Sequence, residues 1–112
     1  MADESNVTLA TLVAQAKDRC RITWDDEGTN RRFTNEIVPN AVSVMRFKIG
    51  IPASVEFDFT EAGLEHDLIM GYCYYAWHDA TDEFYRNYAE DLAHARRIWE
   101  VRAFAEQEEA AS

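Results

Sequence analysis

Apolar side chains recur every three or four residues along most of the chain, which is the spacing of one helix face. Four such segments predict helices at about residues 8–22, 29–49, 61–79 and 81–106. The third segment is apolar on nearly all sides, so we expect it to be the central buried helix. The fourth, at about 25 residues, would extend about 37 Å, longer than so small a domain needs for its own core.

Short polar side chains precede each predicted helix, where they can accept hydrogen bonds from free backbone N–H groups. The candidate caps are, in chain order, Thr8, Asp25 or Asp26, Thr60, and Thr81 or Asp82. Pro39 lies inside the second predicted helix and removes one backbone hydrogen bond, so we expect a kink or a break there. Gly71 in the third costs about 1 kcal/mol relative to alanine, and close approach of another helix would explain it.

Residues 53–59 follow a different pattern, because Val55, Phe57 and Phe59 alternate with Glu56 and Asp58. Alternation of this kind predicts a short strand near residues 54–59, or an ordered extended loop. A lone strand could pair within the domain or with another subunit. The sequence thus predicts one mainly α domain over residues 1–112. It would be a small bundle of about four helices with a long C-terminal helix, and residues 1–6 and 107–112 would be flexible or partner-ordered tails.

The net charge of −10 is concentrated in one half of the chain. Residues 1–52 carry 7 basic and 7 acidic side chains, whereas residues 53–112 carry 4 basic and 14 acidic ones. Such a surface repels nucleic-acid phosphates and suits docking to a basic partner. The simpler interpretation is that the acidity only maintains solubility.

Membrane insertion and secretion are not expected, because no apolar run spans a bilayer and the first residues do not resemble a signal peptide. Cys20 and Cys73 stand alone in apolar surroundings, and we expect them to be reduced thiols in a cytosolic compartment.

Catalytic and metal-binding patterns are missing from the sequence. His66 and His78 are 12 residues apart on one predicted helix, about 120° out of phase, so they cannot share a metal ion. Residues 25–28 lack the alternating ligands of a calcium loop. The tyrosines of the third helix could line a pocket, but packing in the core or at an oligomer interface is the favoured interpretation. We therefore predict neither enzymatic activity nor a cofactor.

Four segments resemble head–tail connector (adaptor) proteins of long-tailed bacteriophages. They are residues 21–33, with RITWDD and TNRRF, residues 55–59 (VEFDF), residues 68–75 (LIMGYCYY) and residues 83–92 (EFYRNYAEDL). The similarity covers roughly residues 8–102, and Pro39 departs from the family pattern.

The resemblance implies a structural subunit of the phage neck. Such proteins form a ring, usually with twelve-fold symmetry, below the portal protein. They join the portal to the next neck or tail component and continue the channel through which double-stranded DNA passes without specific binding. The expected location is the virion neck, and the host cytoplasm during assembly. The family has no catalytic residues.

Three groups of residues are candidates for these contacts. We expect the last helix and its tail to dock on the portal, through Trp99, Arg102, Phe104 and Glu106. Inter-subunit or loop contacts are expected at Trp24, Asp25, Asp26, Val55 and Phe57, with Trp24 folded back onto the core. An acidic channel wall or partner surface is expected at Glu56, Asp58, Glu61 and Glu65.

Two other classes of function remain open. A small acidic interaction or inhibitor protein would be a monomer or dimer with tight, salt-sensitive binding to a basic partner. A small helical enzyme or ligand-binding module would have an internal pocket with converging polar groups. A connector predicts no deep pocket, and ring assembly on a portal.

Overall fold

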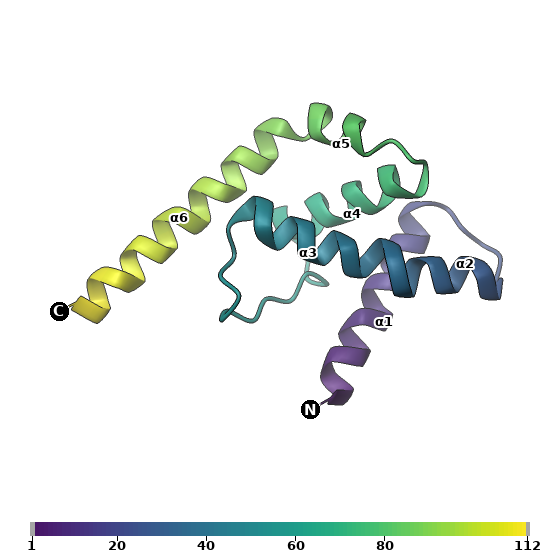
Figure 1. Cartoon of the computed structure of the whole chain (residues 1–112), viewed down its shortest axis with the longest axis horizontal. Helices are drawn as coiled ribbons and strands as arrows, with labels where there is room; N and C mark the ends of the chain where they lie inside the picture. Colours follow the sequence, from purple (N-terminus) through teal and green to yellow (C-terminus); the bar gives the residue numbers. More distant parts are fainter. Residues whose placement is uncertain (1, 112) are drawn as a thin grey trace.

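The computed structural model describes the backbone of residues 2–111 and the side chains of residues 8–105. Its elements are α1 (Ala2–Arg19), α2 (Glu27–Arg32), the π-helical turn η1 (Phe33–Ile37), α3 (Val38–Ile49), α4 (Leu64–Trp77), α5 (Thr81–Asn87) and α6 (Ala89–Ala111). Figure 1 shows their arrangement. The predicted mainly α fold with a long C-terminal helix is confirmed, and residues 2–111 contain no strand.

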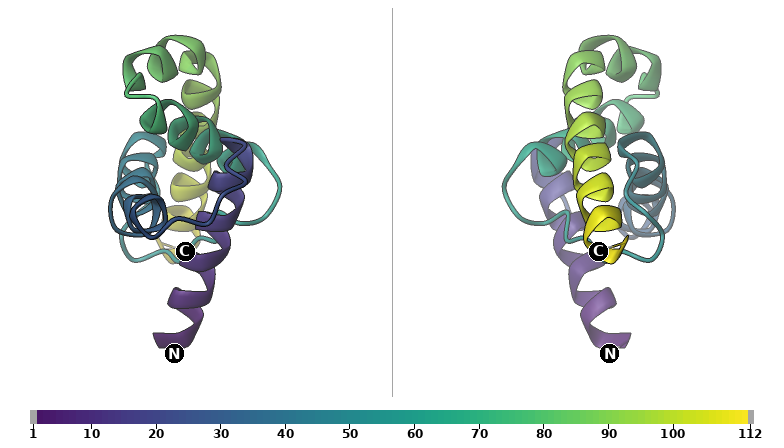
Figure 2. Two further views of the ribbon diagram at one scale, coloured as in Figure 1. Left: turned by 90° about the vertical axis from the view of Figure 1, so that its right-hand side faces the viewer. Right: turned by 90° about the vertical axis from the view of Figure 1, so that its left-hand side faces the viewer.

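Helix α4 lies at the centre of the molecule, as predicted. It packs against α1, α3, α5, α6 and η1, and six consecutive residues, 68–73, are buried. A helix buried on all sides needs apolar residues all round, which explains the unbroken apolar composition of this segment. Figure 2 shows α5 and the start of α6 at one end of the molecule and the amino-terminal end of α1 at the other.

The second predicted helix is irregular just before Pro39. It begins at Glu27, changes to a π-helical turn at Phe33 and returns to an α-helix at Val38. The N–H group of Val38 donates to the carbonyl of Phe33, five residues earlier. Pro39 then occupies the first turn of α3, where its missing N–H group is tolerated. The irregularity predicted at Pro39 thus takes the form of a wide turn.

The last predicted helix is two helices, so the prediction of one continuous helix from about residue 81 to residue 106 is wrong. Tyr88 separates α5 from α6 with φ −113° and ψ 15°. Its ring packs against α4 at Gly71, where an added Cβ would lie 2.7 Å from the Tyr88 Cζ atom. The close approach predicted at Gly71 therefore exists, but the partner is an aromatic ring at a helix junction.

Two predicted helix starts are also wrong. Helix α1 begins at Ala2, so Thr8 lies inside it. Helix α4 begins at Leu64 instead of near Glu61. Thr60 does not cap it, because its N–H and hydroxyl groups both donate to the Asp58 carboxylate, at 2.9 and 2.6 Å.

The segment between α3 and α4 is an ordered loop, the second of the two structures predicted for residues 54–59. Arg46 donates from one guanidinium nitrogen to the carbonyls of Pro52 and Val55. Phe59 is buried, and its carbonyl lies 2.8 Å from His66 Nδ1. Gln15 of α1 donates to the Thr60 carbonyl at 3.2 Å. These contacts hold the loop on the bundle, and no strand pairing is needed.

Asp26 caps α2, as the sequence predicted. Its carboxylate accepts hydrogen bonds from the N–H and hydroxyl groups of Thr29, at 2.9 and 3.1 Å. These bonds favour the charged carboxylate and lower the Asp26 pKa below its ordinary value of 3.8. The stability that the cap contributes is therefore fully present above that pH and is lost as the pH falls through the lowered pKa.

Replacing this cap gives a pH-dependent prediction. Asp26→Ala should lower the melting temperature at pH 7, because the N–H of Thr29 loses its acceptor, and the difference from the parent chain should shrink at pH 3. Circular dichroism melts at both pH values measure this. Glu36→Ala, which removes an exposed carboxylate of η1, is the control and should show a smaller, pH-independent change. An equal Asp26→Ala effect at both pH values would contradict the assignment.

Candidate functional site

Trp99 was predicted to dock on the portal, but it belongs to the core and that assignment is wrong. Its side chain is 3% exposed. The ring packs edge-on against Phe57 with centroids 5.5 Å apart, and its Nε1 group donates to the Glu65 carboxylate at 3.3 Å. The Arg102 guanidinium lies 4.5 Å from the ring centroid. Trp99 therefore joins α6 to α4 and to the loop before it.

An exposed apolar strip runs along the distal part of α6. Ile98, Val101 and Phe104 are 38%, 64% and 62% exposed, and this end of α6 extends away from the other helices (Figure 1). Phe104 is in the predicted docking set, and the side chain of Glu106 lies outside the described residues. Ile98 and Val101 were not among the predicted docking residues, although steps of three residues connect them to Phe104 along the helix.

The residues predicted for inter-subunit or loop contacts have different roles. Trp24 is 51% exposed and does not fold onto the core. Its Nε1 group donates to the Thr29 hydroxyl at 3.3 Å, which holds the ring on the surface. Asp25 accepts a hydrogen bond from the Asn30 amide at 2.7 Å.

Val55 and Phe57 are half-buried and pack against the core of their own subunit. The Phe57 ring contacts both Phe59 and Trp99. These two residues were predicted to make inter-subunit or loop contacts. The contacts that they make within their own chain hold the loop in place.

The four predicted acidic residues do not form one surface set. Glu56, Asp58 and Glu61 are exposed on the loop between α3 and α4. The carboxylate of Asp58 is occupied by Thr60, and these hydrogen bonds lower its pKa. Glu65 is half-buried and accepts the hydrogen bond of Trp99, so its carboxylate supports the fold. Glu56 and Glu61 form no ion pair with any other residue whose side chain is described.

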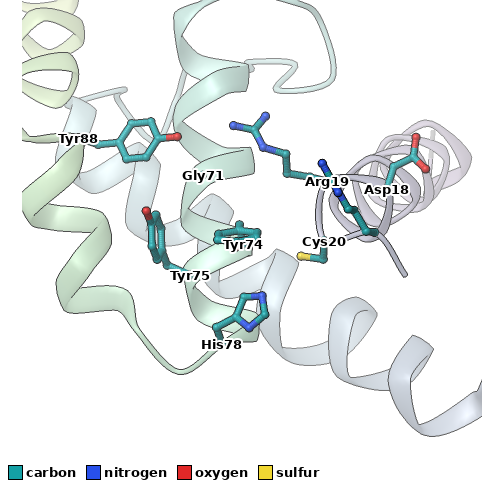
Figure 3. Close-up of a pocket in the computed structure, with 9 residues that line it drawn as sticks. Asp18, Arg19, Cys20, Gly71, Tyr74, Tyr75, His78 and Tyr88 are labelled. Carbon is teal, nitrogen blue, oxygen red and sulfur yellow. The ribbon is translucent and has the colours of Figure 1, made fainter. Parts of the chain in front are cut away.

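A cavity of about 620 Å³ opens to solvent between α1, α4 and the α5–α6 junction. Residues 18–21 line it at the carboxyl end of α1, and Gly71, Tyr74, Tyr75, His78 and Tyr88 line the facing side. Figure 3 shows the tyrosines and His78 on one side and Arg19 and Cys20 on the other, with the Asp18 carboxylate directed away from the tyrosines. For Tyr74 and Tyr75 a pocket was the alternative to the favoured prediction of core or interface packing, and both line this cavity. No spacing rule connects them with the end of α1.

The polar groups of this cavity are partly unpartnered. Among the residues whose side chains are described, neither Arg19 nor Arg21 forms an ion pair or hydrogen bond through its guanidinium. Tyr75 accepts a hydrogen bond from the Asn87 amide at 2.9 Å. The Tyr74 ring packs against His78 with centroids 4.7 Å apart. The cavity therefore offers cationic donors beside aromatic surface.

Both cysteines are free thiols. Burial raises the pKa of Cys20, in the cavity wall, to about 11 and that of the core residue Cys73 to about 12. Neither is therefore an activated nucleophile at neutral pH.

No cluster of three or more histidine, cysteine or acidic side chains within residues 8–105 is arranged to hold a metal ion. In the same described part of the chain, no helix combines the length and apolar character needed to cross a membrane. Comparisons with protein-family models, curated proteins and solved structures give no match.

Trp99 is buried and Phe104 is exposed on α6, so replacing each with alanine should change the stability by very different amounts. Trp99→Ala should lower the free energy of unfolding by about 3–5 kcal/mol, because it removes a buried aromatic side chain. Phe104→Ala should change it by no more than about 0.5 kcal/mol, because that ring is largely in solvent. Urea denaturation of both variants measures this, and a mild effect of Trp99→Ala would restore Trp99 as a surface candidate.

Proposed function

We propose that this chain is a structural subunit of a bacteriophage neck ring. The ring joins the portal to the next neck or tail component and continues the DNA channel, in the virion neck and, during assembly, in the host cytoplasm. The subunit acts by contact alone. The observation that carries this proposal is the exposed apolar strip of Ile98, Val101 and Phe104 on the projecting end of α6.

Exposed apolar side chains in a row on a monomer are typical of a surface that a partner covers. The strip lies on a helix whose buried residues, Ala95 and Trp99, already satisfy the core, so its exposure is not required by folding. Docking on the portal through this end of α6 would bury the strip. The resemblance of residues 21–33 and 68–75 to connector proteins supports the same assignment.

The charge distribution supports passage of DNA without binding. The second half of the chain carries all of the excess negative charge, and phosphates are repelled by such a surface. An acidic inhibitor protein would share this property. It differs from a connector in forming a compact complex with a basic partner instead of a ring.

The test is electron microscopy of the chain mixed with the portal protein encoded nearest to it. A ring stacked on the portal is expected. Val101→Asp with Phe104→Asp should abolish this layer and leave the melting temperature within a few degrees, because both side chains are exposed. Ala93→Asp introduces the same charge on an exposed part of α6 nearer the bundle and should leave the ring intact.

Deletion of residues 104–112 tests the same docking end without adding charge. Portal binding should be lost while the circular dichroism spectrum stays helical. Unchanged portal binding by this variant and by the double aspartate variant would refute the docking surface, and a small complex with a basic partner in place of a ring would favour the inhibitor.

A further inference from the structure

The carboxyl end of α1 carries an arginine in a backbone conformation that favours glycine. Arg21 has φ 58°, while its N–H group donates to the Asp18 carbonyl and that of Ile22 donates to the Lys17 carbonyl. This pair of bonds is the usual helix ending with a left-handed residue. At the end of α3 the left-handed position is taken by Gly50, with φ 87°. Asp79 at the end of α4 has φ 54° and the same pair of bonds, from the N–H groups of Asp79 and Ala80 to the carbonyls of Ala76 and Tyr75. At the end of α1 this turn brings Arg21 to the wall of the cavity.

Arg19 and Arg21 bring two positive charges to the cavity wall, and Asp18 contributes the one carboxylate among the lining residues. No described acidic side chain forms an ion pair with either arginine. Guanidinium groups bind carboxylates strongly when the geometry is fixed. Both the charge and the surrounding tyrosines therefore fit an acidic protein segment with apolar neighbours.

The chain itself contains such a segment in the acidic loop, residues 53–63. It carries Glu56, Asp58 and Glu61, and no lysine or arginine occurs anywhere between residues 49 and 85. Glu56 and Glu61 are exposed and form no ion pair among the described residues. The contacts of Arg46, Gln15 and Phe59 already order the loop, so little conformational entropy would be lost when it binds.

The acidic loop and the cavity lie at different ends of α4. The loop leads into Leu64 at the amino end, whereas Tyr74, Tyr75 and His78 line the cavity at the carboxyl end. Ten to fourteen residues of helix correspond to about 15–21 Å along α4, whereas on α1 the loop meets Gln15, one turn before Asp18. Two complementary patches at separate places on one subunit give a head-to-tail contact, which closes into a ring when the rotation allows it.

We propose that the cavity beside Arg19 and Arg21 binds the acidic loop of a second copy of this chain, through Glu56 and Glu61. This contact deepens the proposed neck ring, on which it rests, by naming the surfaces that join neighbouring subunits. It assigns these two glutamates to a subunit contact instead of the channel wall.

Disulfide cross-linking between two variants tests the contact, with both variants carrying Cys20→Ser. Asp18→Cys places a thiol at the edge of the cavity, and Glu61→Cys places one on the acidic loop. The two proteins are mixed and oxidised at high concentration, with and without the portal protein. A covalent dimer is expected in excess over the control pair of Asp18→Cys and Glu36→Cys, whose second thiol replaces an exposed carboxylate of η1.

Substitutions of Arg19 and Arg21 test whether these two side chains make the contact. Arg19→Glu with Arg21→Glu in the Asp18→Cys protein should lower the cross-linking yield about tenfold, the equivalent of one lost charge-assisted contact. Arg21→Gly should also lower the yield, yet leave the melting temperature equal or higher, because glycine adopts the left-handed conformation without strain. A lower melting temperature with an unchanged yield would mean that Arg21 serves only the fold.

The outcomes separate this contact from the proposed function. A ring on the portal without cross-links above the control overturns the contact and leaves the neck ring standing. Cross-links without a portal ring sustain the contact and overturn the neck assignment. If cross-links are absent and the arginine variants instead lose affinity for double-stranded DNA, the cavity binds phosphates and the proposal is wrong.

Discussion

Burial of the middle of α4 is the constraint on which the rest of the structure depends. Residues 68–73 are all inside, so this part of the helix has no polar face, and α1, α3, α5 and α6 each cover part of α4. Gly71 allows this crowding, because a larger residue would meet the Tyr88 ring. Tyr88 is also the residue that separates α5 from α6, so the close approach to α4 and the change of helix direction occur at the same position.

The cavity follows from the same crowding. Helix α1 packs along α4 and ends at Arg19, and the turn at Arg21 directs the chain away from α4 towards α2. Tyr88 closes the opposite side. The space left between them is lined by the last residues of one helix and by the aromatic side of α4, which places cationic groups next to tyrosines although the chain as a whole is acidic.

Hydrophobic periodicity predicted the features that depend on the sequence of a single helix. It failed for features that depend on contacts between segments far apart in the chain. The central helix, the Asp26 cap and the disturbance near Pro39 follow from local rules. The break at Tyr88 does not, because the apolar stripe continues through it from Phe84 to Leu92. Trp24 and Trp99 were both misplaced, since a tryptophan's burial depends on which elements reach it, and neighbouring residues carry little of that information. The cavity unites residues 18–21 with residues 71–88 and has no local signal.

Trp99 connects the acidic loop with the distal part of α6, the two surfaces proposed to bind other proteins. Its ring contacts Phe57 of the acidic loop, its Nε1 group bonds Glu65 of α4, and Arg102 covers it from the distal part of α6. The loop and the projecting end of α6 are therefore braced by one buried side chain. A partner that binds Val101 and Phe104 meets a helix whose position is fixed one turn earlier, and the same contact holds the acidic loop in place. Rigid support of this kind would lower the entropic cost of binding a partner at either surface.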